Sequence, residues 1–192
     1  MPTPRILAFA GSARRDSFNK RLVKIATHGA EQAGAHVTLI DLKDYPLPIM
    51  DQDLEAEQGL PENAVALKKL FLEHDGLLIS APEYNSSITP LLKNTIDWVS
   101  RQAPGEGPLA EYKGKVAALV SASPGKLGGL RGLVHVRSIL GNIGVLVLPD
   151  QMAIPDAHNA FNDDGRLKDE RQQATVERIG QALAELLAKL KT

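Results

Sequence analysis

Short apolar runs alternate with longer helix-like segments along the whole chain, and this alternation constrains the fold more than any other feature. Four of the five runs are nearly continuous Val, Ile, Leu and Ala, as expected of strands that are buried on both faces. The segments between them repeat apolar residues with the period of an amphipathic helix. The sequence therefore predicts a parallel α/β sheet with helices on both faces. The predicted strands are residues 5–10, 36–42, 76–80, 115–121 and 144–148.

The run at 36–42 differs from the other four because polar and apolar residues alternate within it. An alternating strand has one covered and one solvated face, which suits the edge of a sheet. We therefore predict the strand order 2-1-3-4-5, with the second strand at an edge. In open sheets of this order, ligands bind outside the carboxyl ends of strands one and three.

Helix and loop signals complete the pattern. The dipeptide Thr89-Pro90 predicts the start of a helix, because a capping hydroxyl precedes proline at the first helical position. The clearest helix lies near the C-terminus, where apolar residues recur at helical spacing over 176–190. Residues 43–61 and 149–165 are predicted to be loops, because prolines, glycines and acidic residues are frequent there.

Length and charge limit the classes of partner. With 192 residues, 43% of them hydrophobic, the chain is long enough for a single domain over residues 1–192. A domain of this size buries about 70% of the surface of its unfolded chain. The 22 basic and 23 acidic residues give a net charge of −1 and form no block of like charge. We therefore expect small-molecule partners, and neither nucleic acid nor a membrane surface.

The chain contains no cysteine. This excludes disulfides, thiolate metal sites and cysteine nucleophiles, so redox chemistry would need a bound cofactor. The five histidines show no metal-ligand spacing, and no metal is expected. Since the N-terminus does not resemble a signal peptide and no apolar run approaches the roughly 18 residues of a membrane span, we expect a cytoplasmic protein.

The segment 11–19 joins the first predicted strand to a helix and reads GSARRDSFN. Backbone N–H groups at a helix N-terminus lie at the positive end of the helix dipole and bind anions. This loop therefore predicts a phosphate site, although an ordinary strand-to-helix turn capped by Ser17 is an alternative. Neither GxGxxG nor GxxxxGKS/T occurs in the chain, which argues against the common dinucleotide and P-loop sites. The candidate side-chain donors are Ser12, Ser17 and Asn19, with Arg14 or Arg15 as the charged partner.

Two further loops should lie at the same end of the sheet. Residues 81–90 follow the third strand and read APEYNSSITP, and residues 122–129 follow the fourth and read ASPGKLGG. Together they offer an aromatic side chain, backbone amides and small hydroxyls. A planar polar heterocycle such as an isoalloxazine ring needs hydrogen bonds along one edge and apolar cover on its faces.

Three motifs in this order resemble the NADPH-dependent FMN reductase family: GSxRxxSxN at 11–19, PEYNxS at 82–87 and LKNxIDW at 92–98. The resemblance covers nearly the whole chain. It implies a flavodoxin-like three-layer sandwich, FMN as the cofactor, NAD(P)H as the reductant, and a homodimer or homotetramer. The members of this family include quinone, chromate and azo-dye reductases.

The resemblance also implies roles for single residues. It assigns no catalytic side chain, because the cofactor carries the hydride, and Glu83 and Tyr84 would line the ring. The implied cofactor-binding residues are Gly11, Ser12, Arg14, Ser17 and Asn19 at the phosphate, Pro82, Glu83, Tyr84, Asn85 and Ser86 along the ribityl chain and ring, and Ser123, Gly125 and Gly128 on the far side.

The expected function is an FMN-dependent NAD(P)H oxidoreductase. In a ping-pong reaction, NAD(P)H would deliver hydride to FMN N5, and a quinone or a similar acceptor such as chromate, an azo dye or free flavin would take the electrons. The alternative is a flavin-binding electron-transfer or protein-interaction module without NAD(P)H turnover of its own. The helix at 129–140 and the segment 43–61 are candidates for the interface between subunits.

Overall fold

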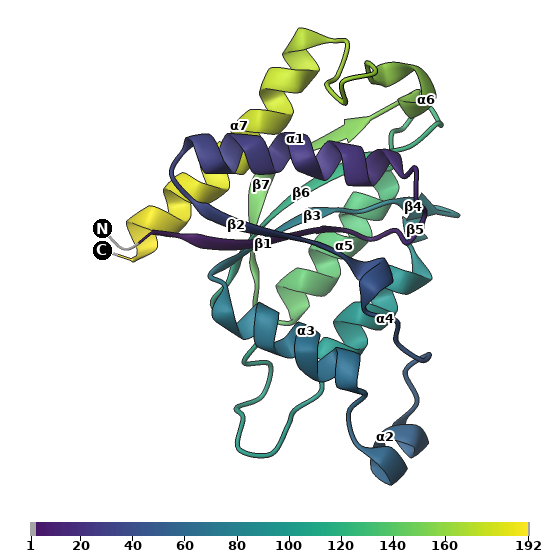
Figure 1. The fold of residues 1–192 in the computed structure, drawn as a ribbon, viewed down its shortest axis with the longest axis vertical. Helices are drawn as coiled ribbons and strands as arrows, with labels where there is room; N and C mark the ends of the chain where they lie inside the picture. Colours follow the sequence, from purple (N-terminus) through teal and green to yellow (C-terminus); the bar gives the residue numbers. More distant parts are fainter. Residues whose placement is uncertain (1–2, 192) are drawn as a thin grey trace.

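A five-stranded parallel sheet forms the centre of the computed structural model, which describes residues 3–191 (Figure 1). Its order, β2-β1-β3-β6-β7, confirms the predicted order 2-1-3-4-5, since β4 and β5 form a separate two-stranded hairpin. The edge position of the second strand is confirmed as well. The strands of the main sheet are β1 (Arg5–Ala10), β2 (His36–Asp41), β3 (Gly76–Ser80), β6 (Val116–Ala122) and β7 (Leu146–Ile154).

Helices cover both faces of this sheet, as Figure 1 shows. The alternation of side chains along β1 divides the core in two. Ile6, Ala8 and Ala10 face one helical layer, whereas Leu7 and Phe9 face the other. The first layer contains α1 (Phe18–Gln32) and α7 (Glu170–Leu190), and the second contains α3 (Glu62–Glu73), α4 (Pro90–Val99) and α5 (Leu130–Asn142). No helix within residues 3–191 is long and apolar enough to cross a membrane.

The predicted loop over 43–61 contains regular structure. Residues 42–44 form the 3-10 helix η1 (Leu42–Asp44), and residues 52–58 form α2 (Gln52–Gln58). Asp41 and Asp51 begin these short helices by accepting hydrogen bonds from backbone N–H groups two residues further on. Because α2 has no buried residue, its sequence shows no apolar periodicity. The prediction of a loop over 43–61 was therefore wrong for α2 and for the part of η1 within this segment.

The last strand is longer than predicted. The prediction of a loop over 149–165 was wrong for residues 149–154, which belong to β7, and for residues 157–160, which form α6 (Ala157–Ala160). The register against β6 shifts between Ala117, which pairs with Val147, and Leu119, which pairs with Gln151. A bulge at Pro149 therefore interrupts an edge strand that continues beyond it, and edge strands tolerate proline.

Helices α1 and α7 cross at backbone contact distance. A Cβ atom on Gly29 would lie 1.9 Å from the Glu177 carbonyl oxygen, and one on Gly180 would lie 1.9 Å from the Ala26 carbonyl oxygen. Both glycines are therefore required by the crossing and not by their backbone dihedral angles. The crossing fixes the position of α1, whose N-terminus adjoins the segment 11–17.

We predict that Gly180→Ala lowers the free energy of unfolding by roughly 1–3 kcal/mol, because the added methyl group has no space between the two helices. Chemical denaturation monitored by circular dichroism measures this change. The matched control is Gly141→Ala, since a Cβ on this helical glycine meets nothing within 4 Å. The control should be neutral or slightly stabilising. Equal stability of the two variants would contradict the described crossing.

Candidate functional site

The loops that follow β1, β3 and β6 meet at the carboxyl end of the sheet, as predicted. Gly11 connects to two of its neighbours, because its N–H donates to the Ser80 carbonyl at 2.9 Å and its carbonyl accepts from the Thr89 hydroxyl at 2.7 Å. Thr89 also caps α4, where Pro90 is the first residue, so this predicted helix start is confirmed. The Ser121 hydroxyl of β6 donates to the Ala81 carbonyl at 2.7 Å, so the three segments border one region.

The segment 11–17 presents free hydrogen-bond donors to this region. Ser17 occupies the N-cap position of α1, but its hydroxyl makes no capping bond and donates to no other described residue. The Ser12 hydroxyl accepts only from the Arg14 N–H, at 3.3 Å. This donor set matches the chemistry of a phosphate group at a helix N-terminus. Within residues 3–191, no acceptor is present for the backbone N–H groups of Ser12, Ala13, Arg15, Asp16 and Ser17.

Asn19 lies behind this segment. Its side chain is buried, and its amide oxygen accepts from the Ser80 hydroxyl at 2.8 Å and from the Ala122 N–H at 3.0 Å. Its amide nitrogen donates to the Ala122 carbonyl at 2.8 Å. Asn19 thus joins the first turn of α1 to the ends of β3 and β6.

The loop after β3 forms a short hairpin that the sequence did not predict. Strands β4 (Glu83–Tyr84) and β5 (Ser87–Ile88) are joined by Asn85 and Ser86, whose φ angles of 49° and 69° are left-handed. Two left-handed residues in succession form the type I′ turn that closes tight hairpins. Pro82 before the hairpin is buried, whereas Tyr84 is exposed at its edge.

Glu83 points from the hairpin to α5. Its carboxylate accepts from the Gly132 N–H at 3.0 Å and forms an ion pair with Arg131, also at 3.0 Å. The N-cap residue of α5 is Gly129, which has no side chain to cap the helix. Glu83 therefore supplies the cap from a distant part of the chain. Sequence analysis did not identify Arg131 or this contact, because nothing local links the two segments.

The loop after β6 approaches the end of β7 closely. Gly128 has a φ of 63°, and a Cβ there would lie 2.7 Å from the backbone of Ala153. A Cβ on Gly129 would lie 1.9 Å from the Ser121 hydroxyl. Gly128 therefore permits contact with the end of β7, and Gly129 permits contact with Ser121 of β6. Ser123 and Gly125 lie in the turn before them, where the Ser123 hydroxyl accepts from the Gly125 N–H at 3.2 Å.

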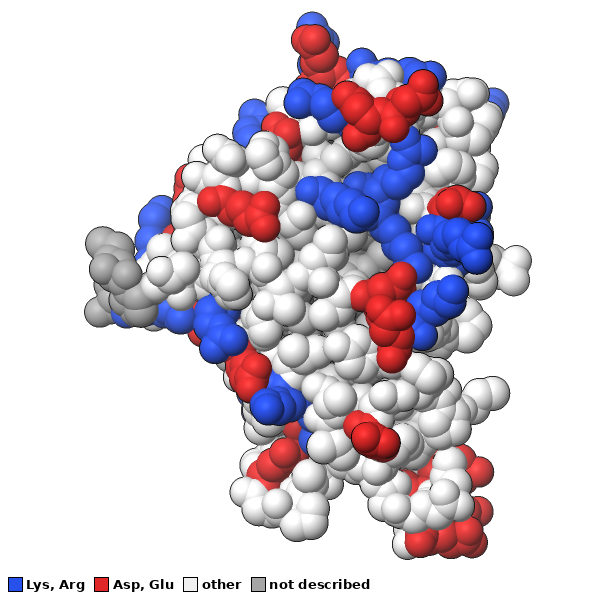
Figure 2. Space-filling model, in the orientation of Figure 1, with Lys and Arg blue, Asp and Glu red and all other residues white. Residues whose placement is uncertain are grey.

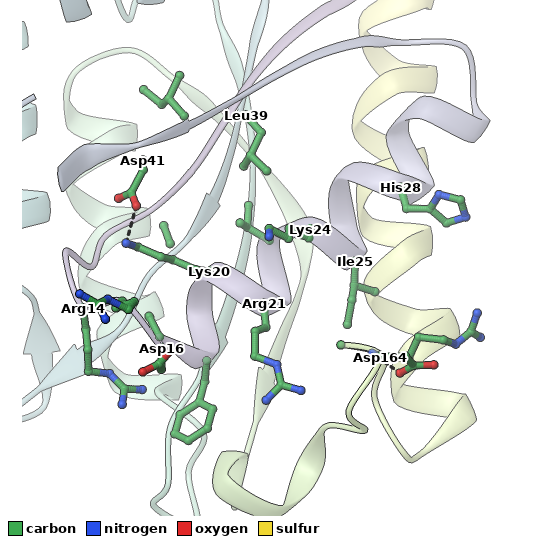
Figure 3. Close-up of a pocket in the computed structure, with 18 of the residues that line it drawn as sticks. Arg14, Asp16, Lys20, Arg21, Lys24, Ile25, His28, Leu39, Asp41 and Asp164 are labelled. Atoms are coloured by element: carbon green, nitrogen blue, oxygen red, sulfur yellow. Dashed lines mark hydrogen bonds and ion pairs between the residues drawn. The ribbon is translucent and has the colours of Figure 1, made fainter. Parts of the chain in front are cut away.

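A groove of about 1220 Å³ runs along α1, and its lining includes residues 14–17 of the loop after β1 (Figure 3). Basic residues on α1 and on the preceding segment form a stripe across this face of the molecule (Figure 2). Lys20 pairs with Asp41 of β2 at 2.5 Å. Partial burial opposes ionisation of Asp41, but the hydrogen bonds from Lys20 and the Lys43 N–H outweigh it and lower the pKa of Asp41.

No group of three or more histidine, cysteine, aspartate or glutamate side chains gathers into a metal-ligand arrangement within residues 3–191. The polar groups of the three loops include hydroxyls, amides, the carboxylates of Asp16 and Glu83 and the guanidinium groups of Arg14 and Arg15. The donors among them suit a phosphorylated organic ligand. The donors of the segment 11–17 thus fit the phosphate of FMN.

Comparison with known proteins gives the family. The model of the family described as NADPH-dependent FMN reductase matches residues 4–159. An NAD(P)H-dependent FMN reductase of Pseudomonas aeruginosa is 34% identical over 188 residues, which are 97% of each chain. An NAD(P)H:quinone oxidoreductase of Solanum tuberosum is 34% identical over 199 residues, covering 99% of this chain and 96% of the relative.

A solved structure extends the likeness to the fold. The flavoenzyme NAD(P)H:(acceptor) oxidoreductase FerB of Paracoccus denitrificans superposes with a TM-score of 0.80 at 28% identity, covering 97% of this chain and 98% of that chain. The flavodoxin-like fold class is thereby confirmed. The chain belongs to the NADPH-dependent FMN reductase family and is an oxidoreductase that uses FMN and NAD(P)H.

Proposed function

We propose that the protein oxidises NAD(P)H and reduces a quinone or a similar small acceptor at the carboxyl end of its sheet. The observation that carries this proposal is the set of free donors in the segment 11–17, next to the hairpin and the loop after β6. When bound there, FMN supplies an electron carrier that accepts hydride at N5 and gives up two electrons. The names of the potato and Pseudomonas relatives support this type of reaction.

The phosphate of FMN would bind at the N-terminus of α1. Gly11 permits the close approach of α4, since a Cβ there would lie 3.0 Å from the Leu92 Cβ. The hydroxyls of Ser12 and Ser17 would each donate one hydrogen bond, and Arg14 would add the positive charge. Asn19 would hold this segment in place through its bonds to β3 and β6.

The ring would lie between the other two loops. Pro82, Tyr84, Asn85 and Ser86 would border one side of the ring and the ribityl chain, and Ser123, Gly125 and Gly128 would border the other. Glu83 is a positioning residue in this proposal, because its carboxylate holds the hairpin against α5. Hydride transfer requires no side-chain base, so the chain contributes orientation and exclusion of water.

Donor and acceptor would use the same open side of the site in turn, which gives ping-pong kinetics. Initial rates at several fixed quinone concentrations should then give parallel double-reciprocal lines against NAD(P)H, with NADH and NADPH tested separately. Chromate, an azo dye and free flavin complete the panel of acceptors. The purified protein should be yellow, or should stay yellow when FMN is added and the unbound flavin is then removed by gel filtration. Bound FMN without NAD(P)H oxidation would instead favour an electron-transfer or interaction module.

Two variants distinguish a positioning role of Glu83 from a role in proton transfer. Glu83→Ala removes the cap of α5 and should lower the free energy of unfolding by roughly 0.5–2 kcal/mol. It should also slow turnover at saturating FMN. Glu83→Gln keeps one acceptor oxygen for the Gly132 N–H and should retain most of the turnover. The control Arg131→Ala removes a half-exposed ion pair and should be nearly neutral. Equal loss of turnover in the Gln and Ala variants would contradict the positioning role.

We propose further that the protein is a homodimer or homotetramer that associates through the start of α5. Leu127, Leu130 and Val134 are large apolar residues near one another in sequence at this end of the helix, and each is more than two-fifths exposed. Leu130 and Val134 are four positions apart on α5 and therefore share one apolar face, and Leu127 lies in the loop just before this helix. A second copy of the chain would cover it. The cytoplasmic location expected from the sequence stays a prediction.

Val134→Glu should shift the protein toward the mass of one chain, because a buried charge at the interface is unfavourable. Sedimentation equilibrium or light scattering measures the mass in solution. The matched control is Val65→Glu on α3, a valine of similar exposure far from α5. A wild-type mass equal to one chain would contradict association, and an unchanged mass in Val134→Glu would contradict this interface.

A further inference from the structure

Four side chains form a chain of ring and cation contacts beside the segment 11–17. The Arg14 guanidinium carbon lies 5.0 Å from the centre of the Phe18 ring. The Phe18 ring stacks on the Phe161 ring with 6.1 Å between centres and 7° between planes. The Arg21 guanidinium carbon lies 4.5 Å from the centre of the Phe161 ring. Arg14, which precedes α1, and Arg21, which lies in its first turn, are thus connected through Phe18 and through Phe161, which follows β7.

Phe161 is held in this position by its own segment. It is buried and bridges Leu167 across a tight turn, in which the Asn162 N–H donates to the Arg166 carbonyl at 2.8 Å. The Arg21 side chain donates to the Asn162 carbonyl at 2.5 Å and so ties this turn to α1. Phe161 therefore has a fixed position against which the Phe18 ring can stack.

Arg14 lies at one end of this chain of contacts. Arg14 is exposed, and its side chain makes no hydrogen bond or ion pair with another described residue. A guanidinium that stacks through its face keeps its N–H groups at the edge, where they can bind an oxyanion in a bidentate manner. Stacking therefore restricts the motion of this long side chain without using the donors that a phosphate needs.

We propose that Phe161 is a positioning residue for Arg14 and thereby for the phosphate of FMN. The inference rests on the proposed function, because it assumes that Arg14 binds this phosphate. Phe161 orients Phe18, and Phe18 provides the surface on which Arg14 stacks. Arg14 therefore loses less conformational entropy when it binds the phosphate. The turn at 161–167 is then part of the cofactor site although it does not follow β1, β3 or β6.

The discriminating measurement compares FMN with riboflavin, which lacks the phosphate. Phe161→Leu keeps an apolar side chain but removes the aromatic face, and it should weaken FMN binding about threefold to tenfold. Riboflavin binding should change by less than about twofold. Phe161→Tyr keeps the ring and should restore FMN affinity. Quenching of flavin fluorescence gives all of these dissociation constants, and thermal unfolding confirms that each variant is folded.

A double-mutant cycle tests whether the effect passes through Arg14. In the Arg14→Ala background, Phe161→Leu should have no further effect on FMN binding. A loss that persists in this background, or an equal loss for FMN and riboflavin, would overturn the proposal. So would an unchanged FMN affinity in Phe161→Leu. Arg21→Gln is a second variant that loosens Phe161 while keeping both rings, and it should weaken FMN binding about twofold and leave riboflavin binding unchanged.

Failure of the proposed function would have a different signature. If the wild-type protein bound neither flavin, or bound FMN no more tightly than riboflavin, the phosphate site itself would be wrong. A wild-type preference for FMN that Arg14→Ala leaves intact would assign the phosphate to other groups and overturn the role of Phe161. Only the combination of an FMN preference, its loss in Arg14→Ala and its reduction in Phe161→Leu supports the inference.

Discussion

The side-chain amide of Asn19 holds together the end of the molecule where the site lies. It satisfies both the N–H and the carbonyl of Ala122 at the end of β6, and it accepts from the Ser80 hydroxyl at the end of β3. A buried amide that lost these partners would leave several polar groups without hydrogen bonds, each at a cost of about 1–3 kcal/mol. The start of α1 and the ends of β3 and β6 are therefore joined through one side chain.

Much of the fold could be predicted from the sequence, because parallel strands buried on both faces have continuous apolar runs. The order of the strands followed from the alternating pattern at β2. The segments that the sequence did not predict lack such a signal: α2 buries no residue, and the second half of β7 follows a proline at a bulge. The start of α2 depends on its Asp51 cap, and the second half of β7 depends on pairing with β6. A cap and a strand pairing leave no pattern in the hydropathy of the sequence.

The candidate site could be located from the sequence but its contacts could not be assigned. The convergence of the three loops followed from topology. The direction of Glu83 did not, because its partners Arg131 and Gly132 are close only in the folded chain. Gly128 is a second example. The sequence cannot distinguish a glycine required by contact with a neighbouring strand from one required by contact with a ligand. The turn at 161–167 gave no motif that linked it to a phosphate.

The crossing of α1 and α7 limits how closely these two helices can approach each other. Carbonyl oxygens lie where the Cβ atoms of Gly29 and Gly180 would be, so neither helix can move toward the other without a collision between backbones. The hairpin on the opposite side is attached to α5 through the side chains of Glu83 and Ser87. The two contacts therefore differ in kind: α1 and α7 meet through their backbones, whereas the hairpin and α5 meet through side chains, so truncation of a side chain can weaken the second contact but not the first.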